Sequence, residues 1–116
     1  MSVSEDRKEQ ITKSLKRCNE ATIAAALRFE ETRSLDELPT IILGVLERDA
    51  ANPNPAGIAA ATDESRLIED IGMDSFGMIE VVMTAEEVLG ITVATEEMGG
   101  IRTLGELKAF LRAKLA

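Results

Sequence analysis

The sequence has no histidine, tryptophan or tyrosine, and one cysteine among 116 residues. Without histidine, and with a single cysteine, the chain cannot assemble within itself the commonest zinc, haem or iron–sulfur ligand sets. For the same reason it cannot form a Ser–His–Asp or Cys–His catalytic group. We therefore predict no metal site and no enzymatic activity of its own.

Basic and aromatic residues are also scarce. The chain has 13 Lys or Arg against 21 Asp or Glu, a net charge of −8, and three phenylalanines are its only aromatics. An acidic surface repels phosphate backbones, and three aromatics make a poor platform for stacking bases, so we predict no nucleic-acid partner. No apolar run approaches the roughly 20 residues that span a bilayer, and the start MSVSEDRKEQ lacks the apolar centre of a signal peptide. These absences predict a cytoplasmic protein without a membrane span.

The charges divide the chain into two parts. Residues 1–34 carry seven basic and six acidic side chains, whereas residues 35–116 carry six basic and fifteen acidic ones. In the first part, apolar or small side chains recur every three or four residues, at Ile11, Leu15, Cys18, Thr22, Ala25 and Phe29. This spacing predicts one long amphipathic helix over residues 5–32. The helix either packs on its own domain or serves docking or dimerisation through residues 5–32, and the pattern favours Cys18 as a small buried side chain.

Two helices are expected between Asp36 and Gly90. Asp36 is a candidate cap for a helix that runs to about Asp49 with Pro39 in its first turn, where no helical hydrogen bond is lost. The Asn-Pro-Asn-Pro run at 52–55 ends that helix, and a long connection follows from Gly57 to Asp74. The stretch 67–72 should fasten this connection by burying Leu67, Ile68 or Ile71. A second helix is expected from Asp74 or Ser75 to about Leu89, with Gly90 as its stop.

The last part of the chain predicts one short and one long helix. Residues 95–98 suggest a single helical turn that Gly99 and Gly100 cut short. Thr103 and Glu106 have the spacing of a capping box before an amphipathic helix that runs to the end of the chain. The short β-branched stretch 91–93 has no convincing partner strand. We therefore predict an all-α fold.

The pair Asp74-Ser75 stands where a helix begins. Four backbone N–H groups at such a position lack helical partners and favour an anion. Two interpretations remain open on these residues: Ser75 is an ordinary helix cap, or its hydroxyl becomes a phosphodiester, which the helix N-terminus would stabilise by roughly 0.3–1 kcal/mol. The helix that follows is apolar on more of its circumference than one core contact requires, and its exposed apolar residues alternate with glutamates. That arrangement is typical of a docking face, although a deeply buried helix would explain it equally well.

These residues resemble the acyl carrier proteins. The stretch LIEDIGMDSFGMIEVVMTAEEVLGITV is similar to the family's loop ending in Gly-x-Asp-Ser and the helix after it, and ATEEMGGIRTLGELKAFL is similar to its third and fourth helices. The resemblance covers about residues 35–115. It implies an acyl-carrier-type four-helix bundle with three main helices and one short one, here preceded by the long N-terminal helix. It also implies two regions, an N-terminal helical extension (1–34) and an acyl carrier domain (35–116).

The resemblance further implies a function. Ser75 would carry 4′-phosphopantetheine, transferred from coenzyme A by a phosphopantetheinyl transferase, and Asp74 matches the acidic residue before the serine. The chain would be a carrier that delivers a thioester-bound acyl group to partners of fatty-acid, lipid or polyketide-type biosynthesis. Those partners would be acyl-loading and acyl-transfer or condensing enzymes with basic docking patches. The matching positions for docking are Phe76, Ile79, Glu80, Met83, Glu86 and Glu87. The acyl chain would lie between helices, lined by Leu46, Val82, Ala85, Leu89 and Ile101.

Two features depart from the family pattern. Gly77, in the first turn of the recognition helix, costs about 1 kcal/mol against alanine and removes a side chain that is commonly polar in the family. The extension 1–34 lies outside the resemblance. Two alternatives therefore remain: an aminoacyl or peptidyl carrier with the same serine chemistry, and an unmodified helical interaction module in which Ser75 only caps a helix.

Overall fold

Residues 4–115, the part of the chain that the computed structural model describes, form helices joined by turns and loops and contain no β-strand. In chain order the elements are α1 (Glu5–Ser14), α2 (Glu20–Thr32), the 3₁₀ turn η1 (Leu35–Glu37), α3 (Leu38–Asp49), α4 (Pro55–Ala59), the π-helical segment η2 (Leu67–Ile71), α5 (Ser75–Leu89), the 3₁₀ segment η3 (Thr95–Gly100) and α6 (Leu104–Leu115). The all-α prediction is confirmed.

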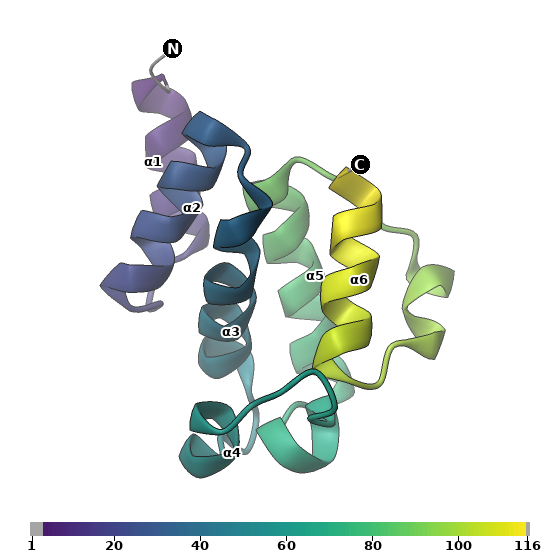
Figure 1. The fold of residues 1–116 in the computed structure, drawn as a ribbon. Coiled ribbons are helices and arrows are strands. Elements are labelled where there is room, and N and C mark those ends of the chain that lie inside the picture. The colour runs from purple at the N-terminus through teal and green to yellow at the C-terminus, as the bar shows by residue number, and fades with distance from the viewer. Residues whose placement is uncertain (1–3, 116) are drawn as a thin grey trace.

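The long helices pack side by side around one core (Figure 1). Helices α1 and α2 form an antiparallel pair, α2 packs on α3, and α3 packs on α5 and α6. Helix α1 also contacts α5. The largest fully buried side chains come from all along the described chain and include Ile11, Leu15, Phe29, Leu38, Leu46, Leu67, Ile71, Leu89, Leu104 and Leu107. Helices α1 and α2 therefore contribute to the same core as the later helices.

Several predicted helix ends are confirmed. Helix α5 begins at Ser75 and ends at Leu89, and Gly90 follows in the left-handed conformation (φ 71°). At the start of α6, the Thr103 hydroxyl accepts the Glu106 N–H (3.2 Å) while the Glu106 carboxylate accepts the Thr103 N–H (3.0 Å). This is the reciprocal pair that the spacing predicted. It leaves the apolar face of α6 turned into the core, where Leu104, Leu107 and Leu111 are buried.

The prediction of one helix over residues 5–32 is wrong. Helix α1 ends at Ser14 and α2 begins at Glu20, with Arg17 between them in the left-handed region (φ 74°). Asn19 is the reason for the restart, because its side chain accepts the Thr22 N–H (2.8 Å) and caps α2. The predicted apolar stripe is still buried apart from the half-buried Cys18, because the turn folds α2 back beside α1 and both halves of the stripe reach the core.

One smaller prediction also needs correction. Asp36 does not cap α3, the helix that ends at Asp49. Ser34 caps the short turn η1 by accepting the Asp36 N–H (3.3 Å), and α3 continues from η1 with Pro39 in its first turn. In the connection from 57 to 74, the short helix α4, which was not predicted, overlaps the start, and η2 lies near the end. Leu67 and Ile71 are buried there as expected, but Ile68 is exposed.

Arg48 joins the N-terminal extension to the rest of the bundle. Its Nη1 donates to the carbonyl oxygens of Ser14 (2.7 Å) and Lys16 (3.4 Å), and its Nη2 donates to the hydroxyl of Thr84 on α5 (2.8 Å). Asp49, 2.9 Å from Nε, raises the pKa of the guanidinium by hydrogen bonding. The apolar stripe of 5–32 is therefore packed on its own domain. Dimerisation through residues 5–32, and the division of the chain after residue 34, stay predictions.

Candidate functional site

Ser75 is the first residue of α5, and its side chain faces solvent. The cap of this helix is Asp74, whose Oδ1 accepts the Gly77 N–H at 2.6 Å. Within residues 4–115, the Ser75 hydroxyl has no hydrogen-bond partner. It stands at the N-terminus of a helix, where an attached anion is stabilised by the helix dipole and the unpaired N–H groups. The aspartate therefore caps the helix, and the serine hydroxyl is exposed beside it.

Gly77 has a packing role that the sequence did not reveal. It is buried, and a Cβ at this position would lie 2.7 Å from the carbonyl oxygen of Asp49 and 3.0 Å from Oδ1 of Asp74. The first turn of α5 therefore approaches the end of α3 closely, and only glycine leaves room for it. This close approach fixes the position of Ser75 relative to α3.

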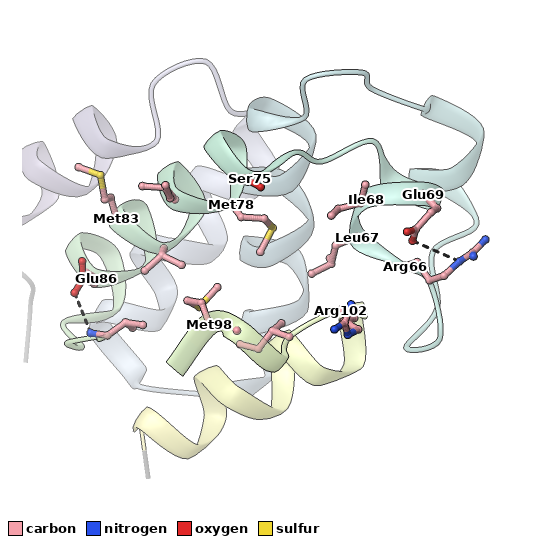
Figure 2. Close-up of a pocket in the computed structure, with 15 residues that line it drawn as sticks. Arg66, Leu67, Ile68, Glu69, Ser75, Met78, Met83, Glu86, Met98 and Arg102 are labelled. Atoms are coloured by element: carbon pink, nitrogen blue, oxygen red, sulfur yellow. Dashed lines mark hydrogen bonds and ion pairs between the residues drawn. The ribbon is translucent and has the colours of Figure 1, made fainter. Parts of the chain in front are cut away.

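A groove of about 650 Å³ lies beside Ser75 (Figure 2). It is bounded by α5, η2, η3 and the loops around η3. Its apolar lining comprises Leu67, Ile68, Met78, Ile79, Val82, Met83, Val93, Met98 and Ile101. Four charged residues also line it, namely Arg66, Glu69, Glu86 and Arg102. A groove of this volume with mostly apolar walls suits a small molecule or a flexible apolar chain.

The groove does not follow the path that we expected for an acyl chain. Val82 and Ile101 line it, but Leu46 and Leu89 are fully buried in the core. The space beside Ala85 and Leu89, between α3, α5 and α6, holds only about 10 Å³. Core side chains fill that interhelical space in this structure, so an acyl path between α3, α5 and α6 stays a prediction.

The apolar residues expected at a docking face are exposed. Phe76, Ile79 and Met83 of α5 are 69%, 58% and 55% exposed. They follow Ser75 at helical spacing, and large apolar side chains gathered on a surface mark interaction sites. We name these three side chains the apolar strip. The strip adjoins the groove, since Ile79 and Met83 also line it.

The three glutamates of the same helix have different surroundings. Glu86 is half-buried, and its carboxylate accepts the Val93 N–H (2.9 Å), which holds the loop after α5. Glu87 is exposed but accepts the hydroxyl of Ser14 from the N-terminal extension (2.5 Å). Glu80 is half-buried and lies close enough to Arg48 to raise the pKa of that guanidinium. Each glutamate therefore has an intramolecular neighbour that the sequence did not indicate.

Sequence reasoning also missed residues at the groove. Arg66 and Arg102 were not singled out, because isolated arginines carry no helical or loop pattern. The structure brings them together through an antiparallel bridge between Arg66 and Thr103 and a hydrogen bond from the Leu67 N–H to the Arg102 carbonyl (2.9 Å). The guanidinium of Arg66 lowers the pKa of Asp70 by hydrogen bonding. The one sequence feature that could have pointed to Arg66 as a groove residue is its position directly before the Leu67–Gly72 stretch.

The fold and this site define a carrier protein rather than a catalyst. Residues 36–111 match the family described as phosphopantetheine attachment site. The match spans more than half of the chain, so the protein belongs to the phosphopantetheine attachment site family, whose members are carriers of that group. Among the described residues there is no cluster of three or more metal-ligating side chains, and none of the helices there is long and apolar enough to cross a membrane.

Curated relatives are acyl carriers. The acyl carrier protein MbtL of Mycobacterium tuberculosis (strain ATCC 25618 / H37Rv) is 34% identical over 83 residues, which are 72% of this chain and 94% of that protein. MbtL of Mycolicibacterium paratuberculosis is 34% identical over 73 residues, 63% of this chain and 78% of its own length. The meromycolate extension acyl carrier protein of Mycobacterium tuberculosis is 28% identical over 74 residues, 62% of each chain. No solved structure matches this chain significantly.

Proposed function

We propose that Ser75 is the attachment residue for 4′-phosphopantetheine and that the chain carries an acyl group on it. The observation that carries the proposal is the Ser75 hydroxyl itself. It is exposed, it lies at the N-terminus of α5 inside the matched range, and none of residues 4–115 binds it. The groove begins beside it. An exposed hydroxyl with an adjacent apolar groove fits a long flexible prosthetic arm with an apolar cargo.

The residues around Ser75 hold it ready for transfer. Asp74 caps α5 and Gly77 lets the first turn press against α3, so the serine backbone is fixed while its side chain stays in solvent. Ser75 Oγ forms the new bond to phosphorus as the bond between that phosphorus and the adenosine bisphosphate of coenzyme A breaks, and its proton leaves to the transferase. The N-terminus of α5 then stabilises the attached phosphodiester by roughly 0.3–1 kcal/mol.

The group supplies a terminal thiol that holds the cargo as a thioester. The groove residues contribute shelter, because an apolar wall of methionine and branched side chains excludes water from a chain that folds into it. Met78 and Met98 both line the groove, and their unbranched side chains adapt to cargo of different shape. The protein therefore acts by positioning and protecting its cargo.

The apolar strip is the proposed contact for partner enzymes. The partners are a phosphopantetheinyl transferase and acyl-loading, acyl-transfer or condensing enzymes. Phe76, Ile79 and Met83 supply apolar contact, and the net charge of −8 steers basic partner surfaces toward the chain. Glu80, Glu86 and Glu87 contribute to that field, although their intramolecular neighbours leave the last two less available for direct contact.

Two observations favour an acyl carrier over the alternatives. The relatives just described are all named acyl carrier proteins, which favours acyl over aminoacyl or peptidyl cargo. An unmodified module would need Ser75 only as a helix cap, but Asp74 fills that role. The lipid or polyketide-type pathway and the cytoplasmic location belong to the same proposal.

The attachment is tested by intact-protein mass. The chain is incubated with coenzyme A, Mg²⁺ and a broad-specificity phosphopantetheinyl transferase. We expect the wild type to gain the mass of one phosphopantetheinyl group, Ser75→Ala to gain none, and Ser34→Ala to gain as much as the wild type. Because the Ser75 hydroxyl has no partner, Ser75→Ala should keep the wild-type melting temperature. Absence of the gain in the wild type, or a full gain in Ser75→Ala, overturns the proposal.

The docking surface is tested with the same reaction. Ile79→Ser should lower kcat/KM for phosphopantetheinylation by about tenfold, which is the effect of losing one well-packed interface side chain. Leu35→Ser is the matched control, because Leu35 is also an exposed aliphatic residue, 41% exposed, but lies outside α5. Equal effects of the two substitutions would place the docking surface elsewhere.

A further inference from the structure

We propose that the groove accepts an acyl chain that carries a carboxylate, and that Arg102 is the side chain that binds this carboxylate. The inference rests on the proposed function, since the cargo reaches the groove only from an arm on Ser75. It goes further by naming the chemical class of the cargo. It rests on which of the charged residues that line this otherwise apolar groove already have a partner within the chain.

Three of these four charged residues already have partners. Arg66 pairs with Asp70 (3.3 Å) and with Glu69 (3.7 Å), so its positive charge is already compensated within the loop. Glu86 accepts the Val93 N–H. Arg102 differs, because across residues 4–115 no carboxylate oxygen lies within 4.0 Å of its guanidinium.

The backbone of Arg102 is held on both sides. Its N–H donates to the Glu106 carboxylate (3.1 Å), and its carbonyl accepts the Leu67 N–H (2.9 Å). The side chain therefore starts from a fixed point at the groove and keeps its donors available. An arginine presents its N–H groups as a planar fork that matches the two oxygens of a carboxylate. One acidic group does lie near Arg102: hydrogen bonds from the Arg102 and Thr103 N–H groups, and to a smaller degree the charge of Arg102, lower the pKa of Glu106. That carboxylate lies more than 4.0 Å from the guanidinium, so among residues 4–115 the Arg102 side chain forms neither an ion pair nor a hydrogen bond, unlike the other charged groups of the groove.

The two ends of the groove differ in charge. Figure 2 shows Arg66, Glu69 and Arg102 toward one end, whereas Glu86 lies with Met83 toward the other. Arg66 and Glu69 form an ion pair, so Arg102 is the positive charge left unpaired at the first end. A carboxylate on the cargo is repelled by Glu86 and attracted by Arg102, and the apolar walls between them take up methylene groups. The same walls would hold an uncharged chain, but such a chain leaves Arg102 without a function. The charge arrangement therefore favours a cargo that is apolar along its length and anionic at one point.

The phosphodiester of the arm is another anion, and the experiment must separate it from the cargo. The chain is loaded with a transferase from adipoyl coenzyme A labelled with ¹³C at the free carboxyl, from hexanoyl coenzyme A, or from coenzyme A alone. Loading is verified by mass. Arg102→Gln is compared with the wild type and with Arg112→Gln, which removes an equal charge from an exposed position on α6 outside the groove.

The first readout is the pKa of the labelled carboxyl, measured by NMR titration. In the wild type and Arg112→Gln we expect it to lie about 0.5 or more below the value in adipoyl pantetheine free in solution. In Arg102→Gln it should return to the free value. An unshifted pKa in the loaded wild type, or the same shift in Arg102→Gln, overturns the inference.

The second readout is the melting temperature together with the ³¹P spectrum. We expect the adipoyl form to melt above the hexanoyl form in the wild type, and this difference to vanish in Arg102→Gln. If Arg102 bound the arm's phosphodiester instead, Arg102→Gln would change the ³¹P shift equally in all three loaded forms, which overturns the inference. Failure of the loading step itself overturns the proposed function and the inference with it, whereas successful loading without these differences overturns the inference alone.

Discussion

Replacing Arg48 with methionine should loosen the N-terminal extension. The Arg48 side chain is 9% exposed and makes hydrogen bonds to Asp49, to Thr84 and to the carbonyl of Ser14. Methionine keeps most of the apolar stem but none of the donors. Asp49, whose side chain is 2% exposed, is then left without its counter-ion. Breaking a largely buried pair on one side is expected to reduce the free energy of unfolding by about 2–4 kcal/mol.

A second substitution separates the cost of the unpaired Asp49 carboxylate from the cost of the lost hydrogen bonds. In Arg48→Met/Asp49→Asn the uncompensated carboxylate is gone, so we expect the double variant to regain about 1–2 kcal/mol relative to Arg48→Met. What remains lost is the set of hydrogen bonds to Thr84 and Ser14, which tie the extension to α5. This residual loss measures the contribution of those hydrogen bonds to the free energy of unfolding.

Urea denaturation followed by circular dichroism measures both variants. A loss of about 3 kcal/mol corresponds to a decrease in melting temperature of roughly 9–18 °C for a chain of this size. Hydrogen exchange should show the amides of α1 opening more readily than those of α6 in Arg48→Met. Arg112→Met is the control, since Arg112 is exposed. A free energy of unfolding within about 0.5 kcal/mol of the wild type would refute the reasoning.

Three further predictions concern other positions. Gly44→Ala should destabilise by about 1–3 kcal/mol in urea despite the better helix propensity of alanine, because the added Cβ overlaps the Thr22 side chain; an unchanged midpoint contradicts this. Burial raises the pKa of the Cys18 thiol, so alkylation at pH 8 should be about tenfold slower than in the urea-unfolded chain, and equal rates by mass spectrometry would disprove it. Hydrogen bonding from Arg66 lowers the pKa of Asp70 from its ordinary value of 3.8, so the contribution of Asp70 to stability is present above that pH and is lost as the pH falls through the lower folded value. Asp70→Asn should therefore lose less stability than the wild type when the pH is lowered from about 4 to about 2, and equal losses in urea titrations would contradict this.

The helices that the sequence predicted well carry strong local signals. Gly90 ends α5, and the Thr103–Glu106 pair begins α6, because these residues satisfy backbone groups within one turn of themselves. The apolar face of α3 was also predictable, since its spacing matches the helical period and the whole face is buried. For these three helices the residues alone were sufficient.

The errors had two sources: a continuous pattern that hid a local signal, and packing between segments that lie far apart in the sequence. The apolar stripe of residues 5–32 is continuous in spacing, so it concealed the turn at Arg17 and the cap at Asn19. The space expected between the helices for an acyl chain could not be predicted from the sequence either. Periodicity tells which side chains face inward, but only packing tells whether they leave space, and the groove opens on the side of Ser75 instead. Arg102 could not be identified from the sequence, because its proposed role depends on the folded structure, in which no carboxylate of residues 4–115 lies within 4.0 Å of its guanidinium.

The extension changes which part of α5 a partner can reach. Ser14 holds the Glu87 carboxylate, and Arg7 donates to the carbonyl of Val88 (3.1 Å), so the C-terminal end of α5 is engaged within the chain. The apolar strip near Ser75 stays exposed. A partner that binds the strip therefore meets the N-terminal end of the helix, beside Ser75 and the groove. The extension thus concentrates the available contact surface at the point where the cargo would be handed over, and Arg48 is the residue on which that arrangement depends.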